Sequence, residues 1–105
     1  MTEVTFFKRN GKLLGFSAEG HSGYAEEGND IICAAISAVT QTAAIYAEEV
    51  LKIDGAVTQD EEQTLLSVIC EGGEGWSSLL KAMEIYLTEV AGQYPKYLTT
   101  RITEV

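Results

Sequence analysis

The sequence predicts an α+β domain in which two helices pack on a mixed or antiparallel sheet of about four strands. Two segments with helical periodicity, roughly 31–51 and 76–94, are flanked by short segments that alternate or are apolar throughout. Their order along the chain is strand, strand, helix, strand, helix, strand. With 105 residues and 46% hydrophobic content, residues 1–105 can bury one core but not two, so a single domain is expected.

The chain begins with a predicted β-hairpin. Residues 2–8 are rich in Thr, Val and Phe, and residues 13–18 resume an apolar pattern. Between them, Asn10-Gly11 suits the positive φ angles of a tight turn. The stretch from Gly20 to Gly28 follows with three glycines and no large aliphatic side chain, so we expect a mobile loop there.

The first helix is predicted over roughly residues 31–51. Asp30 can accept a backbone hydrogen bond as its N-cap residue. Apolar residues then recur at helical spacing: Ile32, Ala35, Ile36, Val39, Ala43, Tyr46, Ala47 and Val50. Because many of these side chains are small, other elements can approach the helix closely, and we expect it to be largely buried.

A polar turn is expected from Asp54 to Glu62, followed by a strand from Leu65 to Cys70. Both faces of that strand are largely apolar, which is typical of an interior strand. The glycine-rich run from Glu71 to Gly75 interrupts the pattern.

A second, amphipathic helix begins near Trp76 and ends before Pro95. Its apolar stripe indicates either core or a dimer interface and consists of Trp76, Leu79, Leu80, Met83, Leu87, Val90, Ala91 and Tyr94. The central part of Tyr97–Val105 alternates and predicts a final strand.

The charge balance narrows the classes of partner. Sixteen acidic and seven basic residues give a net charge of −9, which repels phosphate backbones and anionic membranes. We therefore expect neither nucleic-acid binding nor membrane binding, whereas a cationic protein substrate fits. The sequence shows no charged start followed by an apolar run, and no uninterrupted apolar segment approaches the ~20 residues that span a bilayer. A cytoplasmic location with two free thiols, Cys33 and Cys70, is the expectation.

The sole histidine, His21, lies in the glycine-rich loop twelve residues before Cys33. With Asp30 as N-cap, Cys33 falls at N3, where unpaired amides and the helix dipole favour a thiolate. A protonated His21 beside it would lower the thiol pKa further and could protonate a leaving amine. The backbone amide of Cys33 or Ala34 could stabilise an oxyanion. This pattern indicates a nucleophilic cysteine that cleaves peptide bonds, although a lone cysteine in a buried helix is more often a small hydrophobic residue.

The neighbouring residues allow two interpretations each. Asp30 can cap the helix or orient His21, and the cap is favoured. Ser37 can meet substrate or bond back to the carbonyl of residue 33, and the sequence does not decide between them. Cys70 is expected to pack in the core. Although His21, Asp30, Cys33 and Cys70 could offer four ligand atoms, they lack the clustered spacing of a zinc site, so no metal or cofactor is expected.

The segment Gly20-His21, then Gly28-x-Asp30-Ile31-Ile32-Cys33-Ala34-Ala35-Ile36-Ser37, resembles the signature of the ribosomal-processing cysteine protease Prp family. In length and element order the resemblance extends over nearly the whole chain. It implies a cytoplasmic, homodimeric bacterial enzyme that removes the N-terminal extension of large-subunit ribosomal protein twenty-seven, and a loop that is flexible until substrate orders it.

By this resemblance, His21 corresponds to the catalytic histidine and Cys33 to the nucleophile. The surrounding pattern is matched by Gly20, Gly28, Asp30, Ala34, Ala35 and Ser37. Ser22 stands where alanine is more usual and Ile32 where valine is, and both changes should only tune packing or the loop. Two alternatives to the protease remain: a non-catalytic module that binds a ribosomal protein, and a redox-sensing thiol protein.

Overall fold

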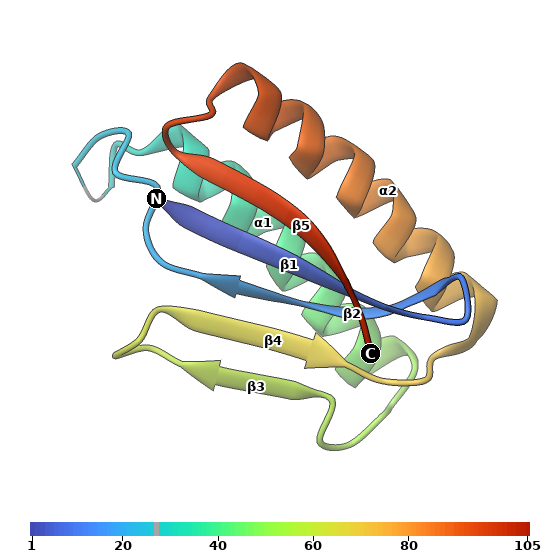
Figure 1. Cartoon of the computed structure of the whole chain (residues 1–105). Helices are drawn as coiled ribbons and strands as arrows, with labels where there is room; N and C mark the ends of the chain where they lie inside the picture. The colour runs from blue at the N-terminus through green and yellow to red at the C-terminus, as the bar shows by residue number, and fades with distance from the viewer. Residues whose placement is uncertain (27) are drawn as a thin grey trace.

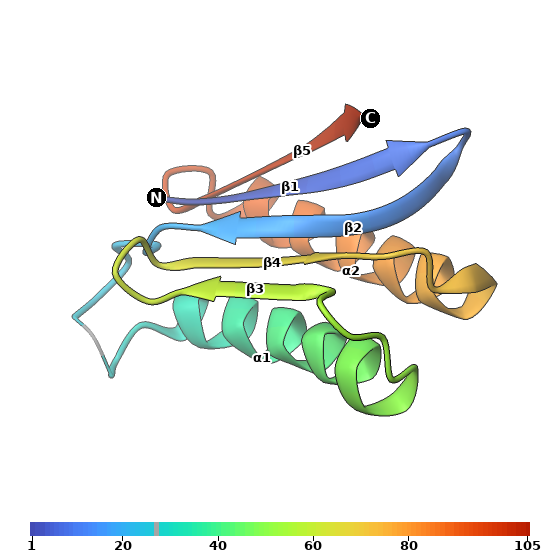
Figure 2. The same cartoon turned by 90° about the horizontal axis from the view of Figure 1, so that it is seen from below.

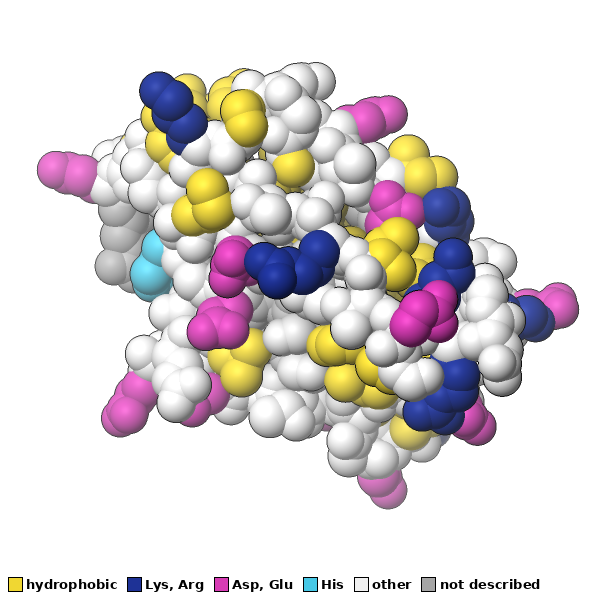
Figure 3. Space-filling model, viewed as in Figure 1, with side chains coloured by type: hydrophobic (Ala, Val, Ile, Leu, Met, Phe, Trp, Pro, Cys, Tyr) yellow, Lys and Arg dark blue, Asp and Glu magenta, His cyan; other side chains and the backbone are white. Residues whose placement is uncertain are grey.

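A computed structural model of the chain describes residues 1–26 and 28–105 and has two layers. One layer is a five-stranded sheet in the order β3-β4-β2-β1-β5, and the other consists of the helices α1 and α2, which cover one face of the sheet (Figures 1 and 2). The open face of the sheet mixes hydrophobic, acidic and basic side chains (Figure 3). The predicted α+β class is confirmed, with one strand more than expected.

The predicted hairpin forms the centre of the sheet. β1 (Thr2–Arg9) and β2 (Lys12–Glu19) pair in antiparallel fashion. The turn residues Asn10 and Gly11 have φ angles of 51° and 80°, as their sequence indicates. β5 (Leu98–Glu104) pairs in parallel with β1, which makes the sheet mixed.

The predicted interior strand is β4 (Leu65–Ile69), which lies between β2 and β3. The prediction of a polar turn over Asp54–Glu62 is wrong in part, because this segment contains β3 (Val57–Asp60). β3 is an edge strand whose Thr58 and Gln59 are exposed. Backbone pairing with β4 stabilises it without an apolar pattern, so periodicity gave no signal.

The first predicted helix has the expected extent but two parts. α1 (Ile31–Ile45) continues into a short π-helix, η1 (Tyr46–Val50), which the periodicity did not predict. Tyr46 lies at this change of pitch, and its ring stacks on Trp76 with a centroid distance of 6.2 Å. The wider turn therefore coincides with an aromatic contact between the two helices.

The second helix begins earlier than predicted. α2 (Gly73–Gln93) includes the last part of the glycine-rich run that we expected to interrupt the pattern. Gly73 to Gly75 are exposed in the first helical turn, where they need not pack, and the carboxylate of Glu74 is favoured there by the helix dipole. The helix ends at Gln93, and Pro95 follows shortly after, as predicted.

The core lies between the sheet and the two helices. Phe6 and Phe16 from the hairpin are fully buried, and so are Trp76, Leu80 and Leu87 from α2. The apolar stripe of the second helix is therefore core around Trp76, which resolves the choice between core and dimer interface for this residue.

The helical segment Ile31–Val50 is long and apolar enough to cross a membrane by length and composition alone. The sequence criterion of an uninterrupted apolar run is stricter than this test, because it excludes a segment that contains a few polar residues. A core helix has the same composition, and here one face is buried within the fold through Ile32, Ile36, Thr40, Ala43, Ala44 and Ala47.

Candidate active site

The N-terminus of α1 forms as the sequence predicts. Asp30 is the N-cap residue, and its Oδ1 accepts a hydrogen bond of 2.9 Å from the backbone N–H of Cys33. This places Cys33 at N3, with its side chain half-buried. The cap holds the cysteine at a fixed position in the first turn, where the helix dipole favours negative charge.

The same carboxylate also fixes the loop that precedes the helix. Its Oδ2 accepts hydrogen bonds from the Ser22 hydroxyl, from the Tyr24 N–H at 3.1 Å and from the Ala25 N–H at 3.4 Å. Burial disfavours the ionised carboxyl, but hydrogen bonds from Ser22, Cys33 and Ala25 outweigh this effect and lower the Asp30 pKa to about 2. Asp30 is therefore ionised at any ordinary pH and joins the loop to the helix.

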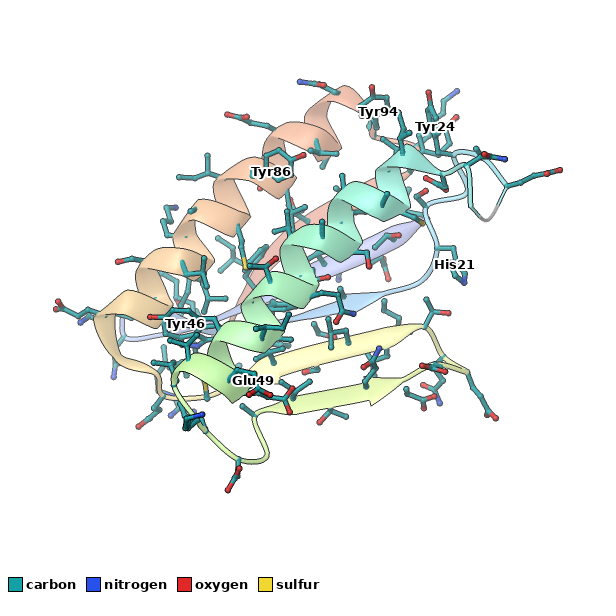
Figure 4. The ribbon with its side chains drawn as sticks, turned by 180° about the vertical axis from the view of Figure 1, so that it is seen from behind. His21, Tyr24, Tyr46, Glu49, Tyr86 and Tyr94 are labelled. Carbon is teal, nitrogen blue, oxygen red and sulfur yellow. The ribbon has the colours of Figure 1, made fainter. Side chains whose placement is uncertain are left out.

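Two further contacts seat the loop on the rest of the fold. Gly20 has a φ of 89°, its N–H donates to the Thr64 carbonyl at 3.0 Å, and a Cβ there would lie 2.6 Å from the Met1 carbonyl oxygen. Tyr24 makes edge-to-face contacts with Tyr94 and Tyr97, and Figure 4 shows Tyr24 beside Tyr94 near the start of α1. The predicted mobility of this loop stays a prediction, and its Glu27 lies outside the described residues.

His21 is exposed and faces the β3–β4 hairpin (Figure 4). Its Nε2 lies 3.3 Å from Thr64 Oγ1. Within residues 1–26 and 28–105, no hydrogen bond joins His21 to Cys33 or to Asp30. The structure thus shows Asp30 as the cap and not as a group that orients the histidine.

Ser22 is the site residue whose role the sequence did not reveal. Its side chain is only 2% exposed, its N–H donates to Cys33 Sγ at 3.3 Å, and its Oγ lies 3.4 Å from the same sulfur. We expected this residue only to tune packing or the loop. Its position directly after His21 was the one available signal, and only the fold of the loop brings it to Cys33.

A cavity of about 680 Å³ opens beside Cys33. Every candidate site residue predicted from the sequence lines it: Gly20, His21, Gly28, Asp30, Cys33, Ala34 and Ser37. Farther along, Thr40 and Gln41 of α1 face Gln59, Asp60 and Glu61 of the β3–β4 hairpin. The hairpin wall was not predicted, because the sequence showed no strand there. Ser37 is exposed in this cavity, and the structure gives its hydroxyl no bond to the carbonyl of residue 33.

The two amides that we expected to stabilise an oxyanion already have partners. The Cys33 N–H donates to the Asp30 side chain, and the Ala34 N–H donates to the Asp30 backbone carbonyl at 3.0 Å. The Ser22 N–H is instead the amide directed at the sulfur. The expectation for Cys33 and Ala34 is therefore wrong for this conformation.

Cys70 takes no part in the cavity. It follows β4, is half-buried against the core, and its N–H donates to the Leu14 carbonyl at 3.2 Å. Burial raises the pKa of its thiol. Both cysteines are free thiols, and core packing of Cys70 is confirmed. In the part of the chain that the structure describes, no group of three His, Cys, Asp or Glu side chains could hold a metal ion.

Comparisons with known proteins identify one matching family. The family model described as cysteine protease Prp matches residues 1–99. Among curated proteins, no sequence matches the chain.

Several solved structures share the fold. SMU.848 from Streptococcus mutans is 25% identical, with a TM-score of 0.83, over 100% of this chain and 96% of that protein. The essential ribosomal processing protease Prp from S. aureus, in complex with a covalently linked product peptide, is 19% identical, with a TM-score of 0.86, over 98% of this chain and all of that protein. The same protease in complex with a substrate peptide gives a TM-score of 0.80 at 18% identity, with 98% of this chain and 100% of that protein covered.

Proposed function

The chain belongs to the cysteine protease Prp family, and from this premise we propose that it removes the N-terminal extension of large-subunit ribosomal protein twenty-seven, with Cys33 as nucleophile and His21 as proton carrier. The observation that carries the proposal is the cavity beside the N-terminus of α1 that both His21 and Cys33 line. The S. aureus protein with the same fold processes a ribosomal substrate and is seen with a covalently linked product peptide.

The proposed reaction proceeds through an acyl-enzyme. The Cys33 thiolate attacks the scissile carbonyl carbon and forms an Sγ–C bond, and the imidazolium of His21 protonates the leaving amine as the C–N bond breaks. His21 then takes a proton from water, which attacks the thioester, releases the new carboxyl end and restores the thiolate. Because His21 is hydrogen-bonded to Thr64 in the free protein, the imidazole must turn toward Cys33 when substrate binds.

Charge supports a basic substrate. The chain carries a net charge of −9, and Asp60 and Glu61 stand at the hairpin side of the cavity. Ribosomal proteins are generally basic, and opposite charge speeds encounter with such a partner. The same acidity supports a protein substrate over a nucleic acid or an anionic membrane.

The cellular setting is also part of the proposal. We infer a cytoplasmic homodimer, as the family resemblance implies, and two free thiols suit a reducing compartment. Sedimentation of the purified protein tests the dimer: a single species with the mass of one chain would contradict it.

Intact-mass analysis of an extended ribosomal protein twenty-seven precursor, incubated with this protein, tests the activity. We expect one cut near the precursor's N-terminus, and no cut with Cys33→Ala or His21→Ala. Cys70→Ala is the matched control, since it removes the thiol that lies outside the cavity, and it should cleave normally. Cleavage by a folded Cys33→Ala protein would refute the nucleophile, and binding of an uncut precursor would favour a non-catalytic binding module.

A further inference from the structure

Ser22 contacts both the nucleophile and the helix cap. Its hydroxyl donates to Asp30 Oδ2, the Cys33 thiol donates to Ser22 Oγ at 3.4 Å, and the Tyr24 N–H reaches the same oxygen at 3.3 Å. The side chain is 2% exposed, so bulk water does not compete for these bonds. One hydroxyl therefore joins the sulfur of Cys33 to the Asp30 cap.

A hydroxyl has one proton to donate and two lone pairs that accept. The ionised Asp30 carboxylate is a stronger acceptor than sulfur and takes the proton of Ser22. The lone pairs of Ser22 Oγ therefore face the Cys33 sulfur and the Tyr24 N–H. A thiol can donate to such an oxygen, whereas a thiolate would face a lone pair with no proton between them.

We propose that Ser22 is a positioning residue that holds the Cys33 thiol in its protonated, resting form and fastens the histidine loop to the start of α1 in the free enzyme. The role rests on the proposed function, because it assumes that Cys33 is the nucleophile. Ionisation of the thiol, in which its proton passes to the imidazole of His21, then requires the Ser22 hydroxyl to turn from Asp30 to the sulfur or the loop to move.

The other titratable groups near Cys33 stay in place when Ser22 is replaced. The titratable side chains that line the cavity with it are His21, Asp30, Asp60 and Glu61. Ser22→Ala removes none of them. The Ser22 N–H bond to the sulfur also survives in alanine, since it comes from the backbone. The variant therefore isolates the hydroxyl.

The test is the pH profile of Cys33 alkylation by iodoacetamide, measured by intact mass in a Cys70→Ala background. Ser22→Ala should lower the midpoint by about half a pH unit to one unit, the effect that one neutral hydrogen bond supports. Ser22→Thr keeps the hydroxyl and should restore the original midpoint. Ser78→Ala removes an exposed hydroxyl on α2 outside this cavity and should leave the profile unchanged.

An unchanged or raised midpoint in folded Ser22→Ala would overturn the inference, as would a Ser22→Thr profile that follows alanine. If Ser22→Ala loses its cooperative thermal transition, Ser22→Gly takes its place. It removes the same hydroxyl and keeps the backbone N–H bond to the sulfur, so it should also lower the midpoint, and an unchanged midpoint there overturns the inference. The proposed function is separable from this result, because it fails when the wild-type protein leaves the precursor uncut, whatever the alkylation profile.

Discussion

Gly20→Ala should destabilise the protein through one close backbone contact. Gly20 has a φ of 89°, and a Cβ at this position would lie 2.6 Å from the Met1 carbonyl oxygen. Real Cβ atoms do not approach an oxygen so closely, so the start of β1 must move. That start is fixed by the Thr2 N–H bond to Tyr97 and by the Thr2 hydroxyl bond to the Gly20 carbonyl.

The expected loss of unfolding free energy in Gly20→Ala comes from the backbone conformation and from the close contact. The left-handed backbone conformation costs a non-glycine residue about 1–2 kcal/mol, and alanine recovers about 0.4–1 kcal/mol by restricting the unfolded chain. The close contact adds about 1–3 kcal/mol, the range for inserting an atom where there is no room. We therefore expect Gly20→Ala to lower the free energy of unfolding by about 1–5 kcal/mol in total.

Gly23→Ala isolates the contact. Gly23 also has a positive φ, 74°, but a Cβ there would meet nothing within 4 Å. The backbone and unfolded-state effects therefore cancel between the two variants, and the difference of about 1–3 kcal/mol measures the contact with Met1. Equilibrium unfolding in guanidinium chloride gives both values. Equal stabilities for Gly20→Ala and Gly23→Ala would refute this reasoning.

Three further predictions concern acid, core and thiol chemistry. The folded Asp30 pKa of about 2 lies below its ordinary 3.8, so ionisation of Asp30 stabilises the protein above pH ~4, and this contribution fades as the pH falls toward 2. The unfolding free energy of Asp30→Asn should lack that pH dependence. Parallel pH profiles of stability for the two proteins would contradict this prediction. Trp76→Phe should lower the unfolding free energy by about 1–3 kcal/mol, because the variant loses buried volume and the 2.8 Å hydrogen bond from Nε1 to the Leu14 carbonyl. Tyr86→Phe, at an exposed position, is the control and should change the unfolding free energy little. Equal unfolding midpoints for the two variants would count against this prediction. Since burial raises the pKa of the Cys70 thiol, the pH midpoint of Cys70 alkylation should exceed that of a free cysteine. Mass spectrometry of a variant that lacks the Cys33 thiol measures this midpoint. A midpoint at or below that of a free cysteine would disprove the burial effect.

Local rules were sufficient where a few neighbouring residues decide the geometry. Asn10-Gly11 predicted the hairpin turn because few residue pairs adopt positive φ at both positions. Asp30 predicted the cap, and counting from it placed Cys33 in the first turn of α1. The candidate site residues therefore converged on one cavity, although the sequence could not show that they would.

The features that the sequence did not predict depend on contacts between segments far apart in the chain. β3 has no apolar alternation, because an edge strand depends on its pairing partner and not on burial of its own side chains. The Ser22 contacts depend on how the loop folds back on α1. The occupied amides of Cys33 and Ala34 are an exception, because the predicted Asp30 cap already implies both bonds: an N-cap side chain accepts from the N3 amide, and the next amide begins the helical hydrogen bonds.

The sequence by itself determined the α+β class, the capped helix that carries Cys33, and the family signature, because each depends on residues close together in the chain. Only the tertiary structure decided which way His21 faces, that Ser22 touches the sulfur, and that the β3–β4 hairpin forms the far wall of the cavity. These features join segments distant in sequence, and their geometry follows from packing and backbone pairing, which no local pattern records.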